Sequence, residues 1–170
     1  MTPDRRDENG ALGANAELAA CERYPLERVP DDHHDEWWLD ARVTEQIDVG
    51  DGFGTVEAGT PVEIKSAAWR ISNGGPRRGR WLLRERAHDQ LREVSGEYAL
   101  LVADPDDTEI AACALRPAWW VEDLVTTWSP ASAQRSGRHV AQIPWSRVFE
   151  ESDEKGIASI SVTNKGGATS

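Results

Sequence analysis

The sequence predicts an α/β (α+β) protein in which a central mixed β-sheet is flanked by helices. Three stretches carry this prediction. Residues 61–69 alternate apolar and polar side chains, as a strand with two unlike faces does. Residues 98–103 form a nearly continuous apolar run, which is typical of a central strand buried on both faces. Between them, residues 85–95 repeat apolar side chains at helical spacing.

The length and the two ends of the chain favour a single domain. Its 170 residues are enough for one hydrophobic core and too few for two domains of ordinary size. We expect a disordered N-terminal segment over residues 1–15, a folded domain over 16–150 and a disordered C-terminal tail over 151–170. With no apolar N-terminal region and no run long enough to span a membrane, we expect a soluble, cytoplasmic protein. The two distant cysteines, Cys21 and Cys113, agree with a reducing compartment.

The first half of the chain favours a helix followed by two antiparallel strands. Residues 16–23 suit a short helix, which Pro25 ends. The aromatic and branched residues of 37–43 predict a strand. The Gly-rich connection over 48–59 then returns the chain antiparallel into the strand at 61–69.

The second half favours short strands separated by two helices. Gly96 ends the helix over 85–95, and Pro117 begins a second helix that runs to about Trp128. Most of the eight tryptophans are expected to pack in the core. Turn-forming residues bound the remaining strands, which are expected at 80–83, 98–103, 109–115 and 138–143.

The charge of the chain is strongly acidic overall but locally basic. The net charge is -11, and only three of the 19 cations are lysines, a composition typical of proteins from a very salty, halophilic cytoplasm. Residues 63–92 nevertheless hold eight cations against three acids. This segment has the charge of a surface that binds a phosphate backbone, and the alternative is that its arginines pair with the acid-rich remainder of the chain.

Glu63 and Lys65 form the first candidate site. Because side chains alternate along a strand, these two residues project from the same face, opposite Val62 and Ile64. Lys65 is also the only lysine in the first 154 residues, which favours a chemical role for its compact ammonium group. The competing interpretation is an ion pair on the protein surface.

Asp40 is the second candidate. Aspartate is disfavoured inside a strand, so its place within 37–43 calls for a reason. If the chain returns antiparallel, Asp40 and Glu63 become neighbours across the two strands. Two carboxylates beside an ammonium group can hold a divalent metal ion next to a phosphodiester.

The order of these motifs resembles the PD-(D/E)xK nuclease superfamily, which has the restriction-endonuclease-like fold. The resemblance covers about residues 16–115 and rests on the strand with Asp40, the Glu63-Ile64-Lys65 strand, the basic helix with His88 and the buried strand after it. It extends to a group of haloarchaeal proteins that carry the same series of motifs. It implies that Asp40, Glu63 and the Ile64 carbonyl hold Mg²⁺ or Mn²⁺, that Lys65 orients the attacking water, and that His88 is an accessory catalytic residue.

The chain departs from the pattern of the superfamily in two respects. No proline precedes Asp40, and the 23 residues from Asp40 to Glu63 are many for a simple hairpin. The second metal carboxylate could therefore be Asp51 or Glu57. The N-terminal helix of such proteins often adds a further carboxylate, for which the candidates here are Glu17 and Glu22.

The resemblance implies a Mg²⁺-dependent nuclease that hydrolyses phosphodiester bonds in DNA, of the restriction, repair or junction-resolving type. DNA, or alternatively RNA, is then the partner, and a homodimer is possible. The expected nucleic-acid-binding residues are Arg70, Arg77, Arg78 and Arg80. The alternative is a catalytically silent module of the same fold that binds DNA or another protein.

Overall fold

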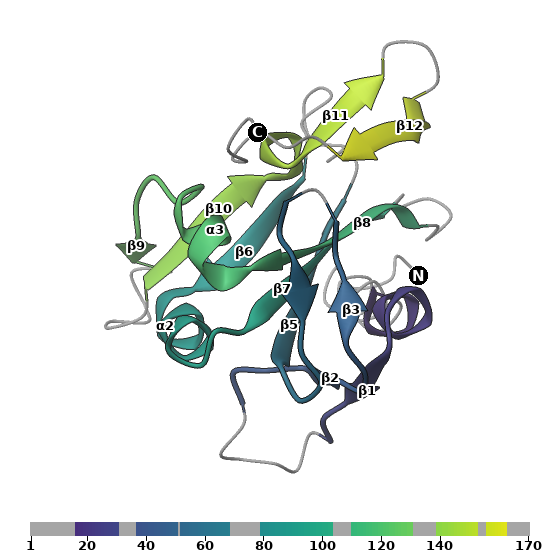
Figure 1. Ribbon diagram of the computed structural model, residues 1–170. Coiled ribbons are helices and arrows are strands. Elements are labelled where there is room, and N and C mark those ends of the chain that lie inside the picture. The colour runs from purple at the N-terminus through teal and green to yellow at the C-terminus, as the bar shows by residue number, and fades with distance from the viewer. Residues whose placement is uncertain are drawn as a thin grey trace, which may run out of the picture.

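A computed structural model of the chain describes residues 16–30, 37–50, 52–68, 79–103, 110–130, 139–152 and 156–162. The fold is built around a mixed five-stranded sheet, in agreement with the fold class predicted from the sequence (Figure 1). Its strands in spatial order are β1 (Leu26–Arg28), β2 (Ala41–Val43), β5 (Pro61–Ala68), β7 (Glu97–Ala103) and β8 (Ile110–Pro117). β5 and β7 are parallel, and the other neighbours are antiparallel.

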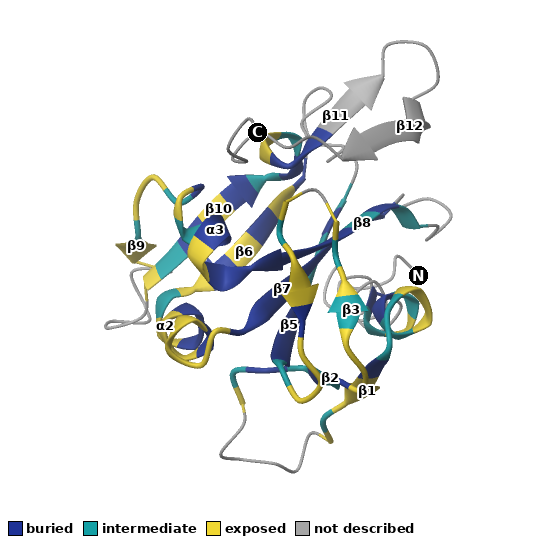
Figure 2. Cartoon of the chain, viewed as in Figure 1, coloured by how far each residue is buried: buried dark blue, intermediate teal, exposed yellow. Residues whose placement is uncertain are grey.

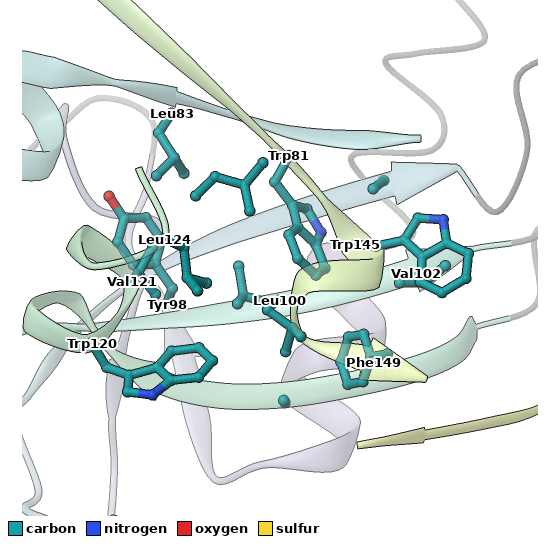
Figure 3. Packing of buried hydrophobic residues seen from close by; sticks show 14 of the residues in the cluster. Trp81, Leu83, Tyr98, Leu100, Val102, Trp120, Val121, Leu124, Trp145 and Phe149 are labelled. Atoms are coloured by element: carbon teal, nitrogen blue, oxygen red, sulfur yellow. The ribbon is translucent and has the colours of Figure 1, made fainter. Parts of the chain in front are cut away.

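One face of this sheet is covered by a second layer. The layer consists of a three-stranded sheet and short helices: β6 (Arg80–Arg84), β10 (His139–Pro144), β9 (Ser129–Pro130), α2 (Glu85–Glu93), α3 (Ala118–Glu122) and the 3-10 helix η2 (Trp145–Arg147). The interface is filled by large side chains, including the fully buried Trp81, Tyr98, Trp145 and Phe149. Figure 3 shows Trp145 and Phe149 at one end of this cluster and Tyr98 at the other. Trp81, Trp120 and Trp145 are therefore packing residues, as expected for most of the tryptophans.

The other face of the sheet is covered by a helix over residues 16–23, which the sequence had predicted. Ala16 and Ala20 of this helix belong to the same apolar cluster as Val62, Ile64 and Leu101. Both faces of the central strands are thus buried, and all seven residues of β7 are buried (Figure 2). The same covering explains why Pro61, Val62, Glu63 and Ile64 are all buried, although alternation alone would allow one of their faces to be open to solvent.

Local periodicity predicted several elements close to their observed bounds. The strands β5, β6 and β7 and the helix α2 lie where the sequence placed them. β2 is shorter than its predicted strand, because Trp37 and Trp38 form a turn. The second predicted helix is also shorter. α3 ends at Glu122, and the backbone continues with i+3 hydrogen bonds up to Val125, since the following β-branched and aromatic residues disfavour a helix.

Several short strands were not predicted, among them β9. β1 follows the N-terminal helix directly. The Gly-rich connection before β5 contains a hairpin of β3 (Ile47–Asp48) and β4 (Thr55–Val56). Within 151–170, where the sequence predicted no strand, β12 (Gly156–Val162) pairs antiparallel with β11 (Phe149–Ser152).

Gly79 sets the distance between β5 and the start of β6. Its N–H donates to the Ala68 carbonyl at 3.0 Å, and a Cβ at this position would overlap that carbonyl oxygen and lie 2.7 Å from the Ala68 nitrogen. Only glycine permits this approach of two backbones. Among the described residues, no helix has the length and apolar character needed to cross a membrane.

Candidate active site

Glu63 and Lys65 form a short ion pair inside the fold. The Lys65 Nζ atom lies 2.8 Å from Glu63 Oε1, and the side chains are 20% and 9% exposed, respectively. Both residues project from the face of β5 that also carries Ala67, which packs under β6 and α2. The pair is therefore largely buried, and the alternative of an ion pair on an exposed sheet face does not describe it.

Glu63 keeps one oxygen without a partner. Oε1 accepts from Lys65, whereas the buried Oε2 has no hydrogen-bond partner within the part of the chain that the structure describes. Burial raises the pKa of Glu63, and the nearby Asp40 raises this pKa further, while Lys65 lowers it. A buried anionic oxygen of this kind is stabilised by a cation, because desolvation otherwise penalises its charge.

Asp40 lies beside Glu63, directly before the neighbouring strand β2 and not inside a strand as the sequence predicted. β2 pairs antiparallel with β5 through Ala41 and Val62, which confirms the predicted pairing of the two strands. Asp40 continues this contact: its N–H donates to the Val62 carbonyl at 2.8 Å, and its Oδ2 accepts the Ile64 N–H at 2.7 Å. Asp40 is thus fastened to the residues on both sides of Glu63, and its negative charge is close enough to raise the pKa of Glu63.

The donor set at this place suits a hard divalent cation. Mg²⁺ and Mn²⁺ prefer carboxylate and carbonyl oxygens, and Mg²⁺ is usually bound by one or two carboxylates, with its remaining positions filled by water or phosphate. Asp40, the open oxygen of Glu63 and the backbone of Ile64 provide oxygens of this type. No group of three acidic, histidine or cysteine side chains converges anywhere in the described ranges.

The alternative carboxylates lie elsewhere or outside the described residues. Glu17 forms an ion pair with Arg28 of β1, and its helix packs against the face of the sheet opposite Glu63. Glu22 is exposed on that same helix. Glu57 is exposed after β4, where its Oε1 accepts from Gln46 at 3.5 Å. Asp51 lies outside the described residues.

His88 is buried and does not reach the surface. It has 0% exposure, and its Nδ1 atom lies 2.8 Å from the Tyr98 hydroxyl. Tyr98 is the register partner of Glu63 on the parallel strand β7. His88 thus connects to the site through Tyr98, a residue that sequence reasoning had treated only as part of an apolar run. No sequence signal marks Tyr98, because its position beside Glu63 depends on the register of two strands about 35 residues apart.

Arginines gather on the outer face of β6. Arg80 and Arg84 are exposed, and they flank Leu82, which is 45% exposed. Figure 2 shows this alternation of buried and exposed residues along β6. Arg84 also helps to lower the pKa of Glu63, although it was not among the expected nucleic-acid-binding residues. Three of those, Arg70, Arg77 and Arg78, fall outside the described residues.

Comparison with protein families gives a match that covers most of the chain. The model of the PD-(D/E)XK nuclease superfamily domain matches residues 2–150. This range includes every element from the N-terminal helix to η2 and all the candidate site residues. No curated protein and no solved structure gives a significant match.

Proposed function

The chain belongs to the PD-(D/E)XK nuclease superfamily, and we propose on this basis that it is a Mg²⁺-dependent nuclease that hydrolyses phosphodiester bonds in DNA. Members of the superfamily are typically metal-dependent phosphodiesterases. The observation that supports the proposal most directly is the largely buried Glu63–Lys65 pair beside Asp40, in which Glu63 Oε2 has no hydrogen-bond partner among the described residues. An ion pair formed only for stability would be expected to satisfy both carboxylate oxygens.

Asp40, Glu63 and the Ile64 carbonyl would hold the metal ion. When bound, Mg²⁺ supplies positive charge that offsets the charge of the phosphodiester as it is attacked. The hydrogen bond from the Ile64 N–H holds the Asp40 carboxylate at the edge of β5, so this ligand is positioned before a metal binds. Burial keeps water away from Glu63 and strengthens its attraction for a cation.

Lys65 would act on the water and on the developing charge. One of the three N–H donors of its ammonium group points to Glu63 Oε1, and the other two can hold the attacking water or a phosphate oxygen. The side chain is 20% exposed, so a substrate can reach it. Glu63 therefore both fixes Lys65 and offers its second oxygen to the metal.

The domain that performs this reaction would extend over residues 16–150, with the segments 1–15 and 151–170 outside it. DNA would be held by the outer face of β6, where Arg80 and Arg84 are exposed, together with Arg70, Arg77 and Arg78. None of the residues of β6, β9 and β10 is acidic, although the chain as a whole carries a net charge of -11. A locally cationic sheet face on an acidic protein is a suitable surface for phosphates. A homodimer would allow both strands of a DNA duplex to be cleaved.

A catalytically silent module that binds DNA or a protein is the second candidate. The observation that favours it is the lack of a three-carboxylate cluster among the described residues. Such a module would keep the same fold and the same cationic surface but would turn over no substrate.

Incubation with supercoiled plasmid in molar KCl separates these two functions. The nuclease should nick or linearise the plasmid with Mg²⁺ or Mn²⁺ and should leave it intact with EDTA. Glu63→Gln, which keeps the shape of the side chain and removes its charge, should abolish cleavage. If the folded wild-type protein binds DNA but leaves every plasmid intact with both metals, the silent module is the correct function.

A further inference from the structure

Tyr98 stands beside the candidate metal ligand Glu63 and carries a hydroxyl group. The two residues are direct partners in the parallel pairing of β5 and β7, so their side chains leave the same face of the sheet on strands about 4.8 Å apart. Both are buried. A phenol near a carboxylate would ordinarily donate to it, because a hydrogen bond to a charged acceptor is stronger than one to a neutral acceptor.

The hydroxyl of Tyr98 is instead bonded to His88. Its oxygen lies 2.8 Å from His88 Nδ1, and the two rings stack with centroids 5.8 Å apart and an angle of 18° between their planes. Figure 3 places Tyr98 at the end of the apolar cluster away from Trp145 and Phe149. Glu63 Oε2, in turn, accepts no hydrogen bond from any described residue.

The surroundings of His88 determine which partner donates. Burial lowers the pKa of His88, so the ring is neutral and one of its nitrogens is an acceptor. Glu122 Oε1 lies 3.9 Å from Nε2, which is too far for a hydrogen bond, and Arg92 donates to this oxygen at 2.7 Å. A negative charge on that side favours the proton on Nε2. In the tautomer favoured in this way, Nδ1 accepts and the Tyr98 hydroxyl donates.

We propose that His88 is a positioning residue, which draws the Tyr98 hydroxyl away from Glu63 and thereby leaves Glu63 Oε2 open for a divalent cation. The proposal rests on the metal-binding role of Glu63 in the proposed function. Without an acceptor at position 88, the Tyr98 hydroxyl would turn to a carboxylate. Burial raises the pKa of Tyr98, and Glu63 is the carboxylate whose charge raises this pKa most. The carboxylate would then be occupied by a hydrogen bond that a metal must displace.

Titration of the full chain with Mn²⁺ in a calorimeter tests this role without any measurement of cleavage. His88→Leu, which removes the acceptor but keeps an apolar side chain of substantial volume, should weaken Mn²⁺ binding by tenfold or more. The double variant His88→Leu/Tyr98→Phe should bind Mn²⁺ nearly as well as the wild type, because the competing hydroxyl is gone. Tyr98→Phe alone should bind at least as tightly as the wild type.

The pattern of the variants distinguishes positioning from packing. If the double variant binds Mn²⁺ as weakly as His88→Leu, the defect lies in packing and the proposal is overturned. Weaker binding by Tyr98→Phe alone also overturns the proposal. This variant keeps the aromatic ring, so it still tests the proposal if His88→Leu does not fold. If the wild-type protein binds Mn²⁺ and cleaves DNA with it, and His88→Leu binds Mn²⁺ with unchanged affinity, only the role of His88 is refuted. A wild-type protein that binds no Mn²⁺ refutes both this role and the proposed function.

Discussion

Asp40 is joined to the backbone of the Glu63 strand by a hydrogen bond of 2.7 Å from the Ile64 N–H to Asp40 Oδ2. A single side chain thus completes the pairing of β2 with β5 and also brings a negative charge next to Glu63. These two tasks make different demands, because the hydrogen bond needs an oxygen acceptor whereas metal binding needs a charge.

Substitutions of Asp40 should therefore separate stability from metal binding. Asp40→Asn keeps an oxygen that can accept the Ile64 N–H, so we expect a change in stability of less than about 1 kcal/mol and a loss of most Mg²⁺-dependent cleavage. Asp40→Ala leaves the Ile64 N–H without this acceptor and should cost about 1–3 kcal/mol. Chemical denaturation and plasmid cleavage measure the two effects. Equal cleavage by Asp40→Asn and the wild type would remove Asp40 from the metal site.

Lys65 is best tested by a variant that keeps its charge. Lys65→Ala would leave the buried Glu63 without its cation and should destabilise the fold by about 3–5 kcal/mol, so its loss of activity would be ambiguous. Lys65→Arg preserves the positive charge, but its planar guanidinium cannot place a donor where the ammonium holds a water. We expect a folded protein that binds DNA with nearly wild-type affinity and cleaves it at least a hundredfold more slowly. Lys155→Arg, which lies outside the family match, serves as the matched control. If Lys65→Arg cleaves DNA as fast as this control, the catalytic role of the Lys65 ammonium group is contradicted.

The outer face of β6 should carry part of the affinity for DNA. Arg80 and Arg84 lie four residues apart on one face of the strand, so they can contact separate phosphates about 13 Å apart. Arg80→Ala/Arg84→Ala should reduce affinity for duplex DNA. The negative slope of log affinity against log salt concentration should become less steep by about 0.9 for each phosphate that the protein no longer neutralises. Fluorescence anisotropy in a background that cannot cleave measures both. Arg86→Ala, an exposed cation on α2, is the control, and a double variant that binds like this control would place the DNA on another surface.

The buried carboxyl group of Glu97 should make the stability of the fold depend on pH. Burial raises the pKa of Glu97 to about 8 despite the opposing effect of Arg116. Between the unfolded value of 4.5 and about 8 the folded state binds more protons than the unfolded state, so stability falls as pH rises through this window. Each pKa unit corresponds to about 1.4 kcal/mol, and Glu97→Gln should therefore be more stable than the wild type at pH 9 by a few kcal/mol.

Denaturant unfolding in molar KCl from pH 5 to pH 9 tests this expectation. The profile of Glu97→Gln should be flatter than that of the wild type, while Glu93→Gln on the exposed side of α2 should follow the wild type. Parallel profiles for the wild type and Glu97→Gln would show that the buried carboxylate does not govern the dependence on pH.

Local patterns in the sequence determined the main strands, the helix α2 and the shared face of Glu63 and Lys65. These features follow from the periods of a strand and a helix, which depend only on residues a few positions apart. The pairing of Asp40 with the Glu63 strand was also predictable, because a turn-rich connection returned the chain antiparallel. The same patterns did not predict the β3–β4 hairpin, which forms within a stretch rich in glycine. They also did not predict the early end of α3, which is followed by β-branched and aromatic residues.

The tertiary structure alone decided what surrounds Glu63. Its burial depends on β6 and α2 lying over that face of the sheet, and alternation cannot reveal whether a face is covered. The place of Tyr98 beside Glu63 and the contact of Tyr98 with His88 depend on the parallel register of β5 and β7. That register results from the packing of both faces of the sheet at once, and no short-range pattern encodes it, since the side chains that fix it are distant in the chain.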